Sequence, residues 1–367
     1  WPQWRGPRRG GTSLEAGLLP AWPAGGPRLL WQQTGLGTGW SSPILVGERL
    51  YITGDIGAEL VISAFDRDGQ LLWRTPNGSS WTGSYPGARA TCCYSQGRLY
   101  HLNAHGRLAC LDAKDGTLVW AVDILERFEA SNITWALSEC LLVDGPHVIV
   151  TPGGARALMA ALDKRTGETV WATPPLSGAS TSHSSPVLLS WRGRRLIACC
   201  SSAHGFCVDA DDGTLLWTVP LKNQFGVNAA TPIYGAGAVF FVTPDTEKGR
   251  LYRLREDGPG CTVDEVWQSP LDTVTGSGVL VDGTLYAAGY RRNKWWMALD
   301  WRTGETTATL KALTTGAAIY ADGRLYCLDE KGKAGLIAPE PGGLKLVGQF
   351  QLVADRVNDA WAHPVLL

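Results

Sequence analysis

The segments CLDAKDGTLVW (110–120), ALDKRTGETVW (161–171) and CVDADDGTLLW (207–217) are versions of one pattern. Each has a small residue, an aspartate two positions later, a turn that contains glycine, and a final tryptophan. Further copies, some of them looser, are AFDRDGQLLW (64–73), LREDGPGCTVDEVW (254–267), ALDWRTGETTA (298–308) and the fragment RLLW (28–31). Repetition at a regular period indicates a fold in which each unit needs its neighbours to bury an apolar face.

The pattern predicts a hairpin between two strands. Asp112 stands where the first strand ends, and its carboxylate can accept backbone N–H groups of the turn. Gly116 supplies the positive φ that the turn needs, and Trp120 in the next strand can pack between neighbouring sheets. We expect the tryptophans of the repeat to be blade-docking residues: Trp31, Trp73, Trp120, Trp171, Trp217 and Trp267.

Two more strands are predicted upstream of each hairpin, as in SSPILVG (41–47) followed by ERLYITGD (48–55). The residue at the tryptophan position recurs every 41 to 51 residues, at 31, 73, 120, 171, 217, 267, 308 and 350. Four short strands at this period are typical of a β-propeller blade. A β-sandwich is the alternative, but it gives no reason for the repeated Asp, Gly and Trp.

Eight repeat positions predict an all-β, eight-bladed propeller. The last blade takes its fourth strand from residues 28–32 and its first from residues 360–367, and its second and third strands are absent from this chain. Either a longer native chain supplies them or a partner strand does. Residues 1–27 then form an N-terminal extension that packs on a single propeller domain at 28–367. The start at Trp1 is typical of an exported protein after signal-peptide removal, and equally of a trimmed chain.

Composition excludes several classes of protein. The chain has 367 residues, with 33 basic and 34 acidic side chains and a net charge of −1. This balance argues against nucleic acid or an anionic membrane as the main partner. The sequence contains no run of about 18 apolar residues, so no transmembrane helix is expected.

The frame at 161–171, its relatives at 110–120 and 207–217, and the opening WPQWRGPRRGG (1–11) resemble the PQQ-like β-propeller repeat family, in particular its BamB-like, planctomycete-type members. The resemblance covers nearly the whole chain and is specific for fold. For function it is weak, because one fold carries unrelated activities.

The resemblance implies two functions. The BamB-like branch implies a non-catalytic, extracytoplasmic scaffold in the periplasm or cell envelope that binds other proteins, either in outer-membrane protein assembly or as a subunit of a larger complex. It binds no cofactor or metal. The quinoprotein branch implies an oxidoreductase that holds PQQ and calcium at the channel mouth and acts on an alcohol or sugar. We favour the first, because no Glu/Asn/Asp calcium set can be mapped onto this sequence.

Two adjacent cysteine pairs bear on this choice. Quinoprotein dehydrogenases carry a vicinal disulfide, which makes Cys92–Cys93 and Cys199–Cys200 the positions to compare. Neighbouring residues of a strand point to opposite faces, which opposes such a bond. We therefore expect small buried side chains inside the sheets.

Binding residues of a propeller are expected on the loops that lead into the innermost strands. Arg89 is the strongest candidate for an anion contact, and His183 and His363 are candidate bases; the alternative is that all of these side chains simply fill the channel wall. The candidates for a ligand or partner contact at the channel mouth are Trp40, Arg89, Trp135, His183, Asn228, Asp359, Trp361 and His363.

The run RRNKWW (291–296) is predicted to be an exposed hairpin. One of its two adjacent tryptophans should face outward beside the basic residues, as at an interface. Its candidate partner contacts are Arg291, Arg292, Trp295 and Trp296.

Overall fold

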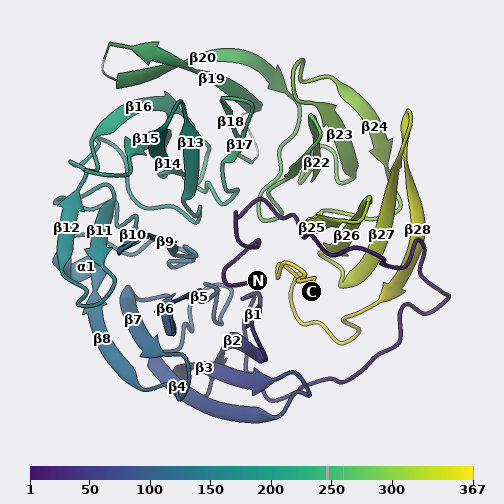
Figure 1. Ribbon diagram of the computed structural model, residues 1–367, viewed down its shortest axis with the longest axis horizontal. Coiled ribbons are helices and arrows are strands. Elements are labelled where there is room, and N and C mark those ends of the chain that lie inside the picture. Colours follow the sequence, from purple (N-terminus) through teal and green to yellow (C-terminus); the bar gives the residue numbers. More distant parts are fainter. Residues whose placement is uncertain (245–247, 259, 367) are drawn as a thin grey trace.

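Seven antiparallel sheets of four strands stand in a ring around a central channel (Figure 1). The structure is a computed structural model that describes residues 1–244, 248–258 and 260–366. The predicted β-propeller is confirmed. The short helix α1 (Ile124–Arg127) follows the second sheet.

Each sheet is one blade, and its strands follow the chain order from the channel outward. The blades are β1 (Ile44–Val46), β2 (Arg49–Ile56), β3 (Glu59–Asp66) and β4 (Leu71–Ser79); β5 (Cys93–Ser95), β6 (Arg98–Leu102), β7 (Arg107–Asp112) and β8 (Leu118–Asp123); β9 (Leu142–Asp144), β10 (His147–Val150), β11 (Ala160–Asp163) and β12 (Thr169–Ala172); β13 (Val187–Trp191), β14 (Arg194–Cys200), β15 (His204–Asp209) and β16 (Leu215–Pro220); β17 (Ile233–Gly235), β18 (Ala238–Phe241), β19 (Gly249–Asp257) and β20 (Gly260–Ser269); β21 (Val279–Val281), β22 (Thr284–Ala288), β23 (Trp296–Asp300) and β24 (Thr306–Leu310); β25 (Gly316–Ala321), β26 (Arg324–Asp329), β27 (Lys333–Glu340) and β28 (Gly343–Gln351).

The repeat pattern joins each blade to the next. In the turn between β11 and β12, the Asp163 carboxylate accepts the backbone N–H groups of Arg165 and Thr166. Gly167 has a φ of +74°, and the Trp120 ring of the preceding blade lies directly against it. The same arrangement pairs Trp31 with Gly69, Trp73 with Gly116, Trp171 with Gly213 and Trp267 with Gly304. Trp217 instead packs in the core between the fourth and fifth blades.

A second set of contacts joins the blades at the channel. Where an innermost strand begins, a backbone N–H group donates to the side chain of the equivalent residue in the next blade. We call these residues the channel belt; its links run from Ser42 to Thr91, Thr91 to Cys140, Cys140 to Ser185, Thr231 to Ser277 and His363 to Ser42. The belt satisfies buried donors that no strand partner reaches.

Two segments, residues 28–32 and 360–366, lie in the eighth blade position. Residues 28–32 and 360–366 contain no assigned strand, and Leu367 lies outside the described residues. Nevertheless, Trp31 packs on Gly69 as a fourth-strand tryptophan does, and its Nε1 donates to the Arg67 carbonyl (2.6 Å). The His363 N–H joins the belt at Ser42 (2.8 Å), as a first strand does. The predicted positions of both segments are thus occupied without a fully formed sheet.

Residues 1–13 enter the channel, where Figure 1 places the N-terminus. The Trp1 and Pro2 carbonyls accept N–H groups from the innermost strands of the first two blades. Arg5 and Arg9 are both 3% exposed. Arg5 donates to the carbonyls of Gly276 and Gly278, and Arg9 donates to those of Cys140 and Leu141. The extension therefore bridges opposite sides of the ring and fills part of the channel.

The rest of the extension covers the outer strand of the seventh blade. The Trp22 N–H donates to the Val347 carbonyl (3.2 Å), and its ring packs edge-on against Phe350 (5.2 Å). Phe350 stands at the repeat's tryptophan position, and Gly26 lies against it. Gly26 of the extension thus packs on Phe350 as a turn glycine of the next blade packs on the other repeat tryptophans.

Neither adjacent cysteine pair is a disulfide. All nine cysteines are free, buried thiols. Cys92 packs in the core between the first and second blades, and Cys93 in the core between the second and third. Cys199 and Cys200 divide in the same way between two other cores. The opposite orientation expected for strand neighbours explains this separation.

We predict that Gly167→Ala lowers the free energy of unfolding by about 2–4 kcal/mol. The new Cβ would lie 2.8 Å from the Trp120 ring, which adds overpacking of about 1–3 kcal/mol to the cost of a positive φ, about 1 kcal/mol. Urea unfolding measures the change. The control is Gly97→Ala, at a φ of +81° with no atom within 4 Å, which carries only the backbone cost. Equal losses in the two variants would contradict the docking role of Trp120.

Candidate functional site

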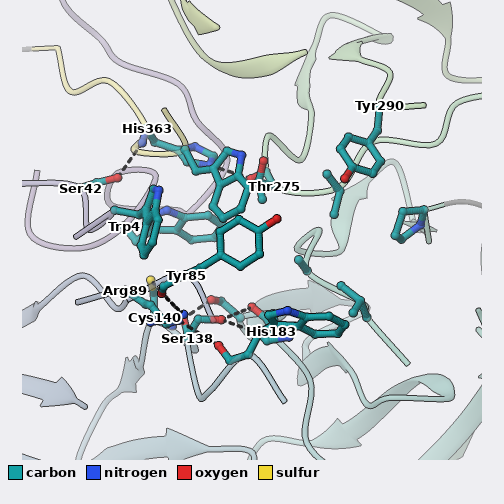
Figure 2. A pocket seen from close by; sticks show the side chains of 18 of the residues that line it. Trp4, Ser42, Tyr85, Arg89, Ser138, Cys140, His183, Thr275, Tyr290 and His363 are labelled. Atoms are coloured by element: carbon teal, nitrogen blue, oxygen red, sulfur yellow. Dashed lines mark hydrogen bonds between the residues drawn. The ribbon is translucent and has the colours of Figure 1, made fainter. Parts of the chain in front are cut away.

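A cavity of about 390 Å³ opens at one mouth of the channel (Figure 2). Its walls come from the loops that connect the fourth strand of one blade to the first of the next, and from loops between second and third strands. Both kinds of loop lie at the same end of an antiparallel blade. The Trp4 ring of the N-terminal extension contributes to the lining from inside the channel.

Aromatic rings form most of the wall. On one side, Trp361 stacks on Trp40 (5.6 Å between ring centroids, 29° between planes) and lies 5.3 Å from Tyr85. Elsewhere in the wall, Trp135 packs edge-on against Phe225 (6.3 Å, 86°). The aromatic lining residues are Trp4, Trp40, Tyr85, Trp135, Phe225, Tyr290 and Trp361. Such surfaces bind flat or apolar groups.

Arg89 holds two of the loops in place. Its guanidinium donates to the Trp135 carbonyl (2.9 Å), to the Gly87 carbonyl (2.6 Å) and to two more carbonyls of its own loop. It also lies over the Trp40 ring, 5.4 Å from the centroid. Burial lowers the Arg89 pKa to about 10, although the nearby Asp55 carboxylate acts in the opposite direction. Most of its donors are therefore committed to the scaffold.

The two histidines of the cavity are held neutral. Burial lowers the pKa of His183 to about 4 and that of His363 to about 3. His183 Nδ1 lies 3.1 Å from Ser138 Oγ, and His363 Nε2 lies 3.0 Å from the Thr275 carbonyl, to which it donates as a neutral ring. Both side chains act mainly as hydrogen-bonded parts of the wall.

The belt residues Ser42, Thr91, Cys140 and Ser185 lie in the lining. The oxygens of Ser42, Thr91 and Ser185 each accept one backbone N–H group from the neighbouring part of the ring. The belt thus supplies polar groups to an otherwise aromatic cavity.

No carboxylate belongs to the described lining, and its charged side chains are Arg89 and Arg291. The nearest acid along the chain to a belt residue is Glu139, which is 1% exposed. Thr151 donates to both of its oxygens (2.9 and 3.1 Å). Burial raises the Glu139 pKa to about 7, against the opposing effects of Thr151 and Arg9.

The structure brings six of the eight candidate mouth residues to the cavity: Trp40, Arg89, Trp135, His183, Trp361 and His363. Asn228 is fully buried beside it and donates to the Ser201 and Leu221 carbonyls, so it braces a loop. Asp359 holds Trp40 through its backbone carbonyl (3.0 Å), while its side chain pairs with Arg356.

The predicted partner hairpin at 291–296 needs correction. Trp296 is 2% exposed and packs in the core between the sixth and seventh blades, because its strand position points inward. Arg291 is exposed and contributes to the cavity lining. Arg292 is exposed and Trp295 is partly buried, with Lys311 over its ring (4.7 Å). These four residues do not form one patch.

Sequence reasoning missed Trp4, Tyr290 and the belt. Tyr290 could have been found, since loops between second and third strands share the face of the mouth loops. The belt also has a sequence signal: Ser42, Thr91, Cys140, Ser185 and Thr231 recur every 45 to 49 residues. Nothing in the sequence indicates that Trp4 returns to the channel.

The cavity does not fit the calcium set of quinoprotein dehydrogenases. Calcium binds six to eight oxygens, chiefly of carboxylates and amides, and the described lining contains no Asp, Glu, Asn or Gln. Across the described residues, no group of three or more His, Cys, Asp or Glu side chains is placed to hold a metal ion. In the same part of the chain, no helix is long and apolar enough to cross a membrane.

The family model and a related protein agree on one family for this chain. A family model described as "Outer membrane protein assembly factor BamB" matches residues 57–306. The assembly factor BamB of Yersinia pestis is 26% identical over 303 residues, which is 77% of this chain and 71% of that protein. Quinohemoprotein alcohol dehydrogenase ADH-IIG of Pseudomonas putida is 31% identical over 143 residues, 36% of this chain and 19% of that protein. The match thus spans about a fifth of the dehydrogenase.

Solved structures share the fold. BamB from Moraxella catarrhalis aligns with a TM-score of 0.57 at 15% identity, over 85% of each chain. The quinohemoprotein alcohol dehydrogenase of Comamonas testosteroni aligns with a TM-score of 0.62 at 13% identity, over 96% of this chain and 73% of that one. At these identities the likeness concerns the fold alone.

We predict that Glu139→Gln becomes more stable than the parent chain as pH rises. The folded-state pKa of Glu139 is raised to about 7 from an ordinary 4.5, so the unfolded chain loses this proton first. Between pH 4.5 and 7 the free energy of unfolding of the parent therefore falls by about 3 kcal/mol, and that of the variant does not change through this group. Above pH 7 the difference between the two proteins is constant. The histidines change stability in the opposite direction, since their folded pKa values are lowered, but they do so equally in both proteins.

Urea unfolding at pH 4.5, 6 and 8 measures this difference. Thr151→Val, which removes one hydrogen bond to the carboxyl group, is the companion variant and should widen the window toward higher pH. A stability difference between Glu139→Gln and the parent that does not vary with pH would contradict a buried, neutralised Glu139.

Proposed function

This chain belongs to the family described as outer membrane protein assembly factor BamB, and from that premise we propose that it is a non-catalytic polypeptide-binding propeller of the cell envelope. Its partners are outer-membrane proteins or their assembly machinery, and it acts as a scaffold on the extracytoplasmic side. The observation that carries the proposal is the aromatic cavity at the channel mouth.

The shape of the cavity supports polypeptide binding. Residues 1–13 and the Trp4 ring occupy the channel behind it, so the cavity is a recess and not a passage. Tyr85 is 44% exposed and Phe225 50% exposed, in the loops that enter the second and fifth blades. Exposed aromatic side chains over a concave site are typical anchors for a partner chain.

The chemistry of the lining supports binding over catalysis. A serine–histidine nucleophile needs a carboxylate or equivalent group to orient the imidazole. Ser138 contacts Nδ1 of His183, and a pKa of about 4 leaves this ring a weak base near neutral pH. We therefore assign no catalytic residue.

A quinone-dependent oxidoreductase is the alternative, favoured by the partial match to alcohol dehydrogenases and by the aromatic walls. Two observations count against it. The described lining lacks carboxylate and amide side chains for calcium, and Cys92 and Cys93 lie in separate cores and outside the lining. We propose that the chain works without PQQ or calcium and derive no step through them.

The proposal predicts that an unfolded outer-membrane protein contacts the cavity rim. Benzoylphenylalanine is placed at Tyr85 or Phe225 in the purified chain, and a urea-unfolded porin is diluted into it and irradiated. Both positions should form adducts with the porin, because they border the aromatic recess. Gel mobility and mass spectrometry measure the yield.

The matched control carries the same photoreactive group at Val170, on the outer strand β12, which is 51% exposed. Its yield should be at least fivefold lower. Equal yields at the three positions would mean that the recess does not select the polypeptide.

The absence of a calcium set predicts the outcome of a PQQ titration. The quenching of the 17 tryptophans reports any quinone that stacks in the cavity. Calcium at 5 mM should change neither the apparent affinity nor the amplitude, because the described lining offers calcium no carboxylate or amide side chain. Saturable binding at micromolar affinity that requires calcium would overturn the non-quinoprotein assignment.

A further inference from the structure

The cavity offers hydroxyl donors for which the described residues supply no nitrogen or oxygen acceptor. Ser42, Thr91 and Ser185 are at most 3% exposed, and each oxygen accepts a backbone N–H group. Among the described residues, none of the three donates its own proton to a nitrogen or oxygen acceptor. Thr91 and Ser185 lie beside the Cys140 thiol, but sulfur is a weak acceptor. A buried hydroxyl proton without a strong acceptor favours a ligand that brings one.

The charges next to the cavity are positive. Arg89 and Arg291 lie in its lining. Arg5 and Arg9 lie behind it, with their guanidinium carbons 5.5 and 5.7 Å from the centroid of the Trp4 ring. Both are buried, and their described hydrogen bonds go to backbone carbonyls and the Gln3 amide, while Glu139 lies close enough to Arg9 to raise its pKa.

The described acidic groups around the cavity lie outside the lining and accept hydrogen bonds or pair with a basic side chain. Thr151 donates to Glu139, and the Trp81 N–H donates to Asp55. Asp272 accepts three successive N–H groups at residues 290–292. Glu330 accepts from Trp361 Nε1 (3.1 Å), and Asp359 pairs with Arg356. Among the described residues, a ligand in the cavity therefore meets hydroxyl donors and cations before it meets a carboxylate.

The aromatic walls of the cavity determine which apolar group the ligand can carry. The stacked rings of Trp40, Tyr85 and Trp361, together with Trp135 and Phe225 elsewhere in the wall, favour a flat apolar group. A volume of about 390 Å³ is at the lower end for small-ligand pockets and is enough for one aromatic group with a short polar end.

We propose that the cavity binds an aromatic carboxylate, with the carboxylate toward the neighbouring hydroxyls of Ser42 and Thr91 and the ring between the aromatic walls. Two oxygens with about four acceptor positions match this set of donors. The ligand is either a free aromatic acid or the last residue of a polypeptide; the second source rests on the function proposed above, and the first does not.

Isothermal titration calorimetry of the full chain tests this inference. N-acetylphenylalanine is compared with N-acetylphenylalaninamide, which keeps the ring and loses the negative charge. A decapeptide ending in phenylalanine is compared with the same peptide amidated at its C-terminus. We expect each acid to bind at least tenfold more tightly than its amide.

Arg291→Gln tests the charge at the rim and should weaken binding of the acids about threefold or more. Arg292→Gln is the control, since Arg292 is exposed and outside the lining while the backbone N–H groups of both residues donate to Asp272. It should bind as the parent does.

The outcomes separate the two proposals. If both acids bind better than their amides, the site recognises the C-terminal carboxylate of a polypeptide. If N-acetylphenylalanine binds and neither decapeptide does, the carboxylate site stands and the polypeptide function fails. If acid and amide bind equally, or no probe binds at millimolar concentration, the inference is overturned.

Discussion

The channel belt is the contact on which the rest of the structure depends. Innermost strands are short, with three residues in β1, β5 and β9, so ladder bonds alone cannot satisfy their first N–H groups. A hydroxyl or thiol from the next blade does so, as Ser185 does for Cys140 (2.9 Å). This bond fixes the rotation between adjacent blades at the axis, while the tryptophan–glycine contacts fix it at the perimeter. The same side chains then form the polar part of the cavity.

This double use explains why the cavity is donor-rich. A serine or threonine that accepts a backbone N–H group still carries a hydroxyl proton. Asp or Glu at these positions would place a charge in the channel wall at a high desolvation cost. A ring built from small hydroxyls is therefore both a stable joint and a surface suited to ligand oxygens.

The fold was predictable because its decisive contacts are local or repeated. One hairpin segment of the sequence already contains the aspartate of the turn, the glycine with positive φ and the tryptophan, as at Asp163 and Gly167. The same pattern recurs along the chain. The mouth residues followed from the repeat as well, since it defines which loops face the channel. The prediction that Trp296 contacts a partner was wrong. Alternation along a strand shows that one of two neighbouring side chains faces inward, but not which one. Packing against the seventh blade determines that it is Trp296.

The position of the N-terminal extension in the channel could not be predicted from the sequence, for a physical reason. Its sequence has no repeat, and its position depends on the carbonyls of Gly278 and Cys140, which lie more than 130 residues away along the chain. Buried arginines without acidic partners are costly unless several carbonyls accept their donors. The open channel of a propeller provides such carbonyls around one axis. The extension therefore has a defined place only after the ring has closed, and its two arginines then make the end of the cavity positive.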